Sequence, residues 1–470
     1  MEEFSTLYKS IFGQEPDSIK PLSAAGSSRR YFRLSGLPSV VVGTYGDNQL
    51  ENKAFVYLSN HFKTKDLPVP SVLAVSDDGK RYIQDDLGDK SLYDFIACNG
   101  AEDPDTFSLM VEALRGLADV QVKGADGIEW NRCFPRPAMD RRAIMWDLNY
   151  FKYCFLKSTG IEFDEEALEN EMIHLCDVVE GDNLMGLMLR DFQSRNIMIH
   201  NSRPYIIDFQ GARKGPLLYD VASFLWQARI ALSHEQRLKL AEKYVAQMKS
   251  LGVDVGADWL QRLQTMALFR MIQVLGAYGF RGLQQQKAQF VTAIPTALNN
   301  ALSLINSLPH CNLDYMKSLL TEVAALPQFK AEKNVGRLTV KVYSFSYKKG
   351  IPTDYSGNGG GFVFDCRALH NPGRYDEYKR LTGRDKPVID FLETDGEILD
   401  FLKSCSEIVD RSVARYVKRG FTNLSVSFGC TGGQHRSVYS AEWMAHHIAE
   451  HFDCNVQLIH REQNITENLG

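Results

Sequence analysis

Short apolar runs separated by turn residues dominate the chain up to residue 88. Residues 31–34 and 39–42 are apolar or alternate around the turn at 35–38, and residues 81–84 form another such run. These runs predict β-strands, whereas the helical spacing of apolar positions at 50–62 predicts one helix between them. We therefore expect a small, strand-rich lobe that ends near residue 88.

Amphipathic helices dominate residues 91–326. Apolar positions recur with the helical period at 233–251 and 261–279, and a short apolar strand interrupts the pattern at 204–207. The segment 326–336 then combines a proline with several charged residues and predicts a linker.

The pattern changes again after this linker. Strands are predicted at 337–347, 361–365 and 423–428, helices at 388–402, 407–418 and 437–451, and glycine-rich turns at 358–361 and 429–434. Strands that alternate with helices favour an α/β domain with a parallel sheet component.

Three polar residues form the most informative pattern. Asn196 follows Asp191 by five residues, and Asp208 ends the apolar strand at 204–207. Phosphoryl transfer needs one carboxylate to orient the acceptor hydroxyl and hard oxygen ligands to hold Mg²⁺ on the nucleotide phosphates. This spacing is that of the catalytic and metal-binding loops of the protein-kinase superfamily, so it predicts a phosphotransferase. The alternative is two capping carboxylates and a turn asparagine.

Composition and charge limit the possible partners and the cellular location of the protein. The 470 residues include 53 Lys and Arg against 58 Asp and Glu, and this net charge of −5 gives no electrostatic case for nucleic acid binding. The nine cysteines contain no C-x-x-C pair, and the N-terminus lacks a basic region followed by an apolar core. No apolar run approaches the roughly 20 residues that span a bilayer. We expect a soluble, cytoplasmic protein.

Ordered motifs make the first part of the chain resemble a known family. The segments 28–34, 84–89, 190–196, 207–210 and 219–223 together look like the aminoglycoside-phosphotransferase family. Within it they most resemble bacterial kinases of N-acetylmuramate and N-acetylglucosamine, which phosphorylate the anomeric hydroxyl in cell-wall (peptidoglycan) recycling. The resemblance implies a bilobal, protein-kinase-like α+β domain that uses ATP and Mg²⁺.

The resemblance also implies roles for individual residues. Asp191 is expected to be the catalytic base, and Asn196 and Asp208 the magnesium ligands. Asp220, at a helix start, is expected to brace the catalytic loop rather than to touch substrate. Nucleotide contacts are expected from the loop over the phosphates and from the hinge: Ser27, Ser28, Arg29, Arg30, Gln84, Asp85, Asp86 and Leu87.

The sequence departs from the family pattern in three places. Leu189 replaces the usual histidine before the catalytic aspartate, which we interpret as a packing substitution. Arg29 and Arg30 replace a glycine-rich run in the covering loop. The strand 41–44 lacks the usual phosphate-pairing lysine, so Lys53, an arginine of the covering loop or backbone amides are expected to neutralise the phosphates.

Acceptor contacts are expected on two helical patches. Asp140, Arg141, Gln273 and Arg281 lie where the resemblance places the acceptor, and aromatic residues stand near them. Sugars are bound by aromatic faces and polar groups, which both patches supply. For any single one of these residues, a solvated helix face is an equally good interpretation.

The last part of the chain resembles the C-terminal domain of RapZ, an RNase adapter protein. The matching segments are 344–350, 364–367, 371–372, 381–388 and 429–439. In that family the domain senses glucosamine-6-phosphate and contacts regulatory RNA. A strand, a glycine-rich turn and a helix N-terminus converge on one point and suit a phosphate. We expect the phosphosugar to be bound by Lys348, Arg367, Cys430, Thr431, Gly432, Gly433, His435, Arg436 and Ser437.

RNA binding is not expected, because residues 331–470 hold 18 Lys and Arg against 18 Asp and Glu. The spacing of Cys430, Gly433, Arg436 and Ser437 also satisfies the loop of cysteine-dependent phosphatases, for which Asp365 is the candidate acid.

The prediction is therefore a bilobal kinase-like domain at 1–326, a linker at 327–336 and a smaller α/β domain at 337–470. The kinase-like domain divides into an N-lobe at about 1–88 and a C-lobe at about 89–326. The leading hypothesis is an amino-sugar kinase with an appended hexosamine-phosphate sensor. The alternatives are a kinase for another hydroxyl compound, such as an aminoglycoside or amino alcohol, a non-catalytic RNA or protein adapter, and a phosphatase in the second domain.

Overall fold

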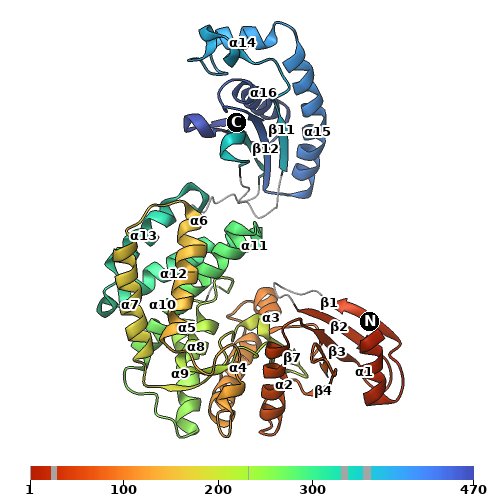
Figure 1. Ribbon diagram of the computed structural model, residues 1–470, viewed down its shortest axis with the longest axis vertical. Coiled ribbons are helices and arrows are strands. Elements are labelled where there is room, and N and C mark those ends of the chain that lie inside the picture. Colours follow the sequence, from red (N-terminus) through yellow and green to blue (C-terminus); the bar gives the residue numbers. More distant parts are fainter. Residues whose placement is uncertain (1, 23–28, 231, 330–336, 353–360, 470) are drawn as a thin grey trace. The chain divides into compact units, whose positions relative to one another are not determined.

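The computed structural model describes residues 2–22, 29–230, 232–329, 337–352 and 361–469. The chain divides into two compact units, which we describe separately (Figure 1). The first unit comprises residues 1–280 and 293–325, and the second comprises 281–292 and 326–470. None of the described helices is both long and apolar enough to cross a membrane.

The first unit begins with a five-stranded antiparallel sheet in the order β1-β2-β3-β5-β4. Phe4 and Tyr8 of the first helix pack on one face of this sheet, against Leu34, Val41 and Ile83. The strand predicted at 39–42 lies two residues later, at β3. The elements are α1 (Glu2–Phe12), β1 (Ser18–Leu22), β2 (Arg30–Ser35), β3 (Val41–Tyr45), α2 (Gln49–Lys63), β4 (Val72–Val75) and β5 (Arg81–Asp85).

The rest of the first unit is mainly helical. Its helices are α3 (Leu92–Asn99), α4 (Pro104–Lys123), α5 (Arg141–Phe151), α6 (Lys157–Thr159), α7 (Glu165–Glu180), α8 (Leu218–Leu225), α9 (His234–Ser250), α10 (Trp259–Tyr278), α12 (Ile294–Ser307) and α13 (Asp314–Ala325). The central turns of α10 are buried on nearly all sides, so this helix forms the middle of the lobe.

Two short antiparallel pairs carry the predicted catalytic segments. β6 (Met185–Met188) pairs with β9 (Arg213–Pro216), and β7 (Ile197–His200) pairs with β8 (Arg203–Ile206). The segment 189–196 connects β6 to β7, and 207–212 connects β8 to β9. Both catalytic segments therefore lie between strands that fix their two ends.

The second unit contains a mostly parallel sheet in the order β11-β12-β10-β13-β14. Its first four strands are parallel, and β14 is an antiparallel edge strand. The strands are β10 (Thr339–Ser346), β11 (Gly361–Asp365), β12 (Asn423–Cys430), β13 (Asn455–His460) and β14 (Ile465–Leu469). The helices are α11 (Ala288–Val291), α14 (Lys386–Glu393), α15 (Glu397–Arg419) and α16 (Arg436–His451).

One predicted helix boundary is wrong. The sequence predicts helices at 388–402 and 407–418, but the break lies between α14 and α15, where Gly396 adopts a φ of +75°. Residues 403–406 continue the helix because Leu402, Cys405 and Val409 keep one buried stripe. The predicted class is confirmed: a bilobal, kinase-like α+β unit is followed by a smaller α/β unit.

Candidate functional site

The structure brings the three predicted catalytic residues together. The Nδ2 atom of Asn196 donates a hydrogen bond to the carbonyl oxygen of Asp191 at 2.8 Å and lies 3.5 Å from the Oδ2 atom of Asp208. The β7–β8 hairpin causes this meeting, since Asn196 immediately precedes β7 and Asp208 lies just beyond β8. Asn196 and Asp208 line a cleft of about 580 Å³, whose other wall includes Val42, Phe55 and Tyr82.

The backbone at two of these positions is held in an uncommon conformation. Arg190 and Asp208 have φ values of +75° and +62°, a region that costs a residue other than glycine about 1–3 kcal/mol. The carboxylate of Asp220 accepts hydrogen bonds from the amides of Leu189 and Arg190 at 2.7 and 2.8 Å. Burial raises the pKa of Asp220 to about 7, although these hydrogen bonds oppose the shift. The prediction that Asp220 braces the catalytic loop is confirmed, and Leu189 is buried as expected of a packing residue.

An arginine that the sequence analysis did not identify controls the charge of Asp191. The Nη2 atom of Arg270, on α10, lies 3.0 Å from the Oδ1 atom of Asp191. Burial raises the pKa of Asp191, but the charges of Arg270 and Arg190 outweigh burial and hold this pKa below its ordinary value. The Asp191 side chain is 44% exposed, whereas that of Arg270 is 4% exposed. Asp191 is therefore an ionised carboxylate that a substrate can reach.

Arg270 has further partners that fix its position. It donates hydrogen bonds to the hydroxyl of Tyr219 at 3.1 Å and to the Oε1 atom of Gln273 at 2.8 Å. A single arginine inside the apolar segment 268–272 was the available signal in the sequence. Such a residue is expected to have a buried partner, but the sequence does not say which one.

Asn196 and Asp208 fit a magnesium site. Their side chains offer amide and carboxylate oxygens, and the Asp208 carboxylate also accepts a hydrogen bond from Gln210 at 2.9 Å. Within the described ranges there is no cluster of three or more His, Cys, Asp or Glu that could hold a metal. Mg²⁺ does not need one, because it uses one or two carboxylates together with water and substrate phosphates.

The predicted hinge residues line the same cleft. Gln84, Asp85, Asp86 and Leu87 lie at and just beyond the end of β5. The Asp86 carboxylate is held by Arg33 at 2.6 and 3.0 Å, and Asp85 accepts a hydrogen bond from the amide of Ser71 at 2.8 Å. Both carboxylates therefore stabilise the hinge, which leaves its backbone as the group able to meet a base.

Arg29 is an arginine of the predicted covering loop that lies in the cleft. It lines the cleft, its side chain is 4% exposed, and its Nη2 atom lies 3.4 Å from the Oε1 atom of Glu51 on α2. Burial lowers the pKa of Arg29, but neighbours that include Tyr82, Glu51 and Asp208 raise it further, so its pKa lies above the ordinary value. The kinase pattern pairs a strand lysine with a helix glutamate. The Arg29–Glu51 contact likewise joins a cation of the cleft to a glutamate on a helix.

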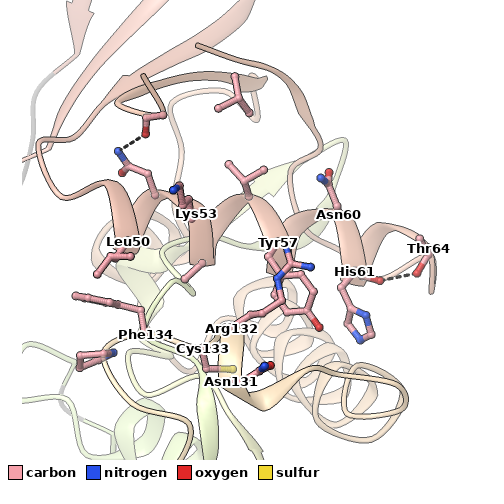
Figure 2. A pocket seen from close by; sticks show the side chains of 16 residues that line it. Leu50, Lys53, Tyr57, Asn60, His61, Thr64, Asn131, Arg132, Cys133 and Phe134 are labelled. Atoms are coloured by element: carbon pink, nitrogen blue, oxygen red, sulfur yellow. Dashed lines mark hydrogen bonds between the residues drawn. The ribbon is translucent and has the colours of Figure 1, made fainter. Parts of the chain in front are cut away.

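Two of the other proposed phosphate contacts are corrected. Arg30 lies on the exposed face of β2, 4.5 Å from the centre of the Tyr45 ring, because neighbouring strand residues point to opposite faces. Lys53 is exposed and lines a different pocket, of about 760 Å³, together with Tyr57 and Arg132 (Figure 2).

Helix geometry explains the position of Lys53. Two residues turn a helix by about 200°, so Lys53 lies almost opposite Glu51 on α2. Ser27 and Ser28 lie outside the described residues.

Of the three predicted acceptor contacts in the first unit, Gln273 alone is linked to Asp191, through Arg270. Gln273 contacts Arg270, as described above. Asp140 caps α5 by accepting a hydrogen bond from the amide of Ala143 at 3.0 Å, and Arg141 pairs with Asp177 and Glu180 on α7. Arg281 groups with the second unit, where its guanidinium lies 5.4 Å from the centre of the Phe290 ring. Asp140 and Arg141 thus have structural partners instead.

The predicted turn of the second unit surrounds a cysteine. Cys430 ends β12, and its Sγ atom accepts a hydrogen bond from the Gly433 amide at 3.2 Å and lies 3.1 Å from the Ser437 hydroxyl. Gly433 has a φ of +68°, and a side chain there would collide with Glu462. Burial raises the pKa of the Cys430 thiol, but hydrogen bonds from Ser437, Gln434 and Gly433 outweigh burial and lower it.

The cations near this turn are unequally available. The Nη1 atom of Arg436, whose side chain is 4% exposed, donates to the carbonyl oxygens of Arg367 and Leu369, both at 2.8 Å. His435 contacts the carbonyl oxygen of Tyr378 at 2.9 Å. Arg436 and His435 thus contact backbone carbonyls, whereas the sequence predicted that they contact a phosphate.

Exposed groups remain at the same edge of the sheet. Arg367 lies over the ring of Tyr347, Lys348 follows directly, and Thr431 accepts a hydrogen bond from Ser346 through its carbonyl oxygen. Gly432 has open space around its Cα atom. These residues follow the carboxyl ends of parallel strands, where ligands bind in open α/β sheets.

Asp365 is poorly suited to be a phosphatase acid. Its carboxylate is bound by the guanidinium of Arg367, and hydrogen bonds from Arg367 lower its pKa despite partial burial. An acid that protonates a leaving oxygen needs a raised pKa instead. Together with the committed Arg436, this contact weakens the phosphatase alternative.

Comparisons with curated proteins and solved structures give distant matches. The chain is 41% identical over 139 residues to a nucleotide-binding protein of Acidithiobacillus ferrooxidans and 42% identical over 120 residues to one of Dechloromonas aromatica. These matches cover 30% and 26% of this chain, which spans only 44% and 41% of the relatives' own length.

Two solved structures are similar at low identity. The first is choline kinase from Cryptosporidium parvum, at 12% identity and a TM-score of 0.47, covering 68% of this chain and 99% of that one. The second is a putative aminoglycoside phosphotransferase from Ralstonia eutropha, at 15% identity and a TM-score of 0.46, covering 68% and 98%.

Family models match both units. The model of the RapZ C-terminal domain matches residues 338–464, and the model of the phosphotransferase enzyme family matches residues 18–252, half of the chain. Asp191 and the cleft residues Asn196 and Asp208 lie within the second of these matches. The chain therefore belongs to the phosphotransferase enzyme family and carries a RapZ C-terminal domain.

Proposed function

We propose that this protein is an ATP-dependent, Mg²⁺-requiring kinase that phosphorylates the anomeric hydroxyl of N-acetylmuramic acid or N-acetylglucosamine in cell-wall recycling. The observation that carries the kinase assignment is that Asn196 and Asp208 line one cleft and that Asn196 joins them to an exposed, ionised Asp191. The cleft is also lined by the predicted hinge and by the buried Arg29, which pairs with Glu51. These are the parts that phosphoryl transfer requires.

The proposed chemistry assigns one task to each group. The Asp191 carboxylate accepts a hydrogen bond from the acceptor hydroxyl and takes its proton as the oxygen attacks the γ-phosphorus of ATP. Asn196 and Asp208 would hold Mg²⁺, which neutralises phosphate charge when bound. Arg29 faces the phosphates from the other wall of the cleft. Arg270 keeps Asp191 ionised.

The charges near Asp191 argue against a cationic acceptor. Arg195 lines the cleft beside Asn196 with an exposed guanidinium. This charge opposes the binding of an aminoglycoside, which carries several positive charges. A neutral or acidic sugar suits this environment better.

We propose that the second unit binds a hexosamine phosphate and reports it to the kinase. Lys348 offers an exposed cation, and Arg367 is exposed with its guanidinium paired to Asp365. The turn 431–435 lies at the carboxyl edge of the sheet, before the N-terminus of α16. A sensor must couple reciprocally: if glucosamine-6-phosphate changes the affinity for Mg·ATP, Mg·ATP must change the affinity for glucosamine-6-phosphate by the same factor. Calorimetric titration of each ligand with and without the other measures this factor, and a factor of one would leave a tether rather than a sensor.

A panel of acceptors tests the substrate. ADP release by the full chain is measured with N-acetylmuramic acid, N-acetylglucosamine, choline and an aminoglycoside, with an acceptor-free reaction as control. We expect turnover with the two amino sugars only. Turnover confined to choline or the aminoglycoside would reject the amino-sugar assignment, and no turnover with any acceptor would favour the adapter alternative.

A further inference from the structure

Arg195 is distinguished from the arginines around it by its lack of a partner. Arg190 is held by Asp147 at 2.8 and 3.1 Å, and Arg270 is held by Asp191 at 3.0 Å. Over the ranges that the structure describes, Arg195 donates no hydrogen bond and forms no ion pair. Its side chain is exposed and lines the cleft beside Asn196 and Asp208.

The position of Arg195 is fixed because it is the immediate neighbour of Asn196 in the sequence. It immediately precedes Asn196 in the short helical turn Ser194–Asn196, whose Ser194 is held by the side chain of Gln227 at 2.8 and 3.1 Å. The side chain of Asn196 contacts both the Asp191 carbonyl and the Asp208 carboxylate, so Arg195 lies next to the residue that joins these two segments. Its guanidinium is exposed in the cleft, where an anion can bind it.

We propose that Arg195 is a further catalytic residue, which donates hydrogen bonds to the phosphoryl group while it is being transferred. This inference rests on the proposed kinase function. Asp191 faces the acceptor oxygen and Asp208 faces the metal side of the nucleotide, so the phosphorus moves between these two carboxylates. A cation near both of them therefore faces the path of transfer.

Arg195 is not changed chemically during the transfer. The acceptor oxygen forms a bond to the γ-phosphorus, the bond from that phosphorus to the β,γ-bridging oxygen breaks, and its electron pair stays on ADP. The acceptor proton goes to the Asp191 carboxylate. Arg195 remains protonated and binds the equatorial oxygens, over which the transition-state charge is spread.

This role differs from those of the other cleft arginines. Arg29 is buried against Glu51, so it contributes to nucleotide binding before and during transfer. Arg270 acts through Asp191 and is a positioning residue. Among the described residues that line the cleft, Arg195 is the arginine that is exposed and has an uncommitted guanidinium, which is the arrangement that lets an arginine act in the transition state.

The test compares Arg195→Gln and Arg195→Lys with Arg203→Gln. Arg203 is an exposed residue of β8 that does not line the cleft. We expect Arg195→Gln to lower kcat by about 10³-fold and to change the KM for ATP and acceptor by less than about threefold. Arg195→Lys should retain part of the activity, because it keeps the charge but loses the fork. Arg203→Gln should behave like the wild type.

Binding of a transition-state analogue separates this role from an acceptor contact. Calorimetry measures Mg·ADP binding with and without aluminium fluoride, which imitates the transferring phosphoryl group. Wild-type and Arg203→Gln proteins should bind Mg·ADP more tightly when aluminium fluoride is present, and Arg195→Gln should lose that gain but bind Mg·ADP normally. An unchanged kcat, a retained gain in Arg195→Gln, or a rise in the acceptor KM alone would overturn the proposal. If no acceptor supports turnover, the proposed substrate fails while this binding experiment still decides the role of Arg195.

Discussion

Arginines lie at both the cleft of the first unit and the turn of the second unit, but their partners differ. Around the cleft, Arg190 and Arg270 pair with the carboxylates of Asp147 and Asp191, whereas Arg29 and Arg195 line the cleft itself. In the turn, Arg436 donates hydrogen bonds to two backbone carbonyls, and the amide of Gly433 donates one to the Sγ atom of Cys430.

The difference shows that the type of partner decides what an arginine can do. An exposed carboxylate such as Asp191 can still accept a proton while it is paired with an arginine. The arginine changes the pKa of that carboxylate. A buried carbonyl partner cannot be released without leaving an unsatisfied acceptor, so Arg436 is part of the fold. The cleft is therefore built for transfer, whereas the turn is built around a rigid loop whose exposed neighbours are the groups available to a ligand.

The largest effect is expected from Asp191→Asn. This variant removes the proton acceptor but leaves Asn196 and Asp208, so kcat should fall by several orders of magnitude while Mg·ATP binding is preserved. Steady-state kinetics and calorimetric ATP titration measure the two quantities. Asp77→Asn, an exposed turn residue, is the control. More than a tenth of wild-type turnover would remove Asp191 from its role. Asp208→Ala should instead weaken Mg·ATP binding itself.

Arg436→Ala should affect stability rather than ligand contacts alone. It leaves the carbonyl oxygens of Arg367 and Leu369 without their donor, at about 1–3 kcal/mol for each buried acceptor. Thermal unfolding should show an earlier transition, with Arg415→Ala, an exposed residue of α15, as the control. An unchanged transition together with lost glucosamine-6-phosphate binding would show that Arg436 faces the ligand after all.

Arg29→Gln and Lys53→Gln form a matched pair on the two sides of α2. Loss of the Arg29 charge should raise the Kd of Mg·ATP by about one to two decades, the usual value of a charge-assisted contact. Lys53→Gln should leave that Kd unchanged, because Lys53 lines a separate pocket (Figure 2). Calorimetry compares the two variants, and the reverse order of effects would contradict the placement of Arg29.

Arg270→Gln should change the pH dependence of kcat/KM. Asp191 must be ionised to accept a proton, and its pKa is held below the ordinary carboxylate value in the wild type, so activity persists as the pH falls through that value. Removing the Arg270 charge raises the pKa of Asp191 and moves the acid limb to higher pH. Arg115→Gln, exposed on α4, should not move this limb. An acid limb that does not move would exclude Arg270 from controlling Asp191.

Features that depend on residues close together in the sequence could be predicted from its local patterns. The spacing of Asp191, Asn196 and Asp208 selected three residues that the structure places together, and the strand and helix periods located most elements. Pairings between distant segments were not predictable: Arg270 lies 79 residues from Asp191, and Arg436 lies 69 residues from Arg367. Lys53 had the expected charge but lies on the wrong side of its helix. The helical and strand periods determine which residues share a face of an element. The tertiary packing decides which other segment that face contacts.

The central claim is tested most directly by the phosphorus NMR spectrum of the full chain with Mg·ATP and N-acetylmuramic acid over time. The account predicts that the γ-phosphate signal is replaced by a sugar-phosphate signal coupled to the anomeric proton, and that Cys430→Ser gives the same spectrum. A signal coupled to a C6 methylene would show that the phosphorylated hydroxyl is wrong. Inorganic phosphate that accumulates in the wild type but not in Cys430→Ser would contradict the account, because it would place the chemistry in the turn instead of the cleft.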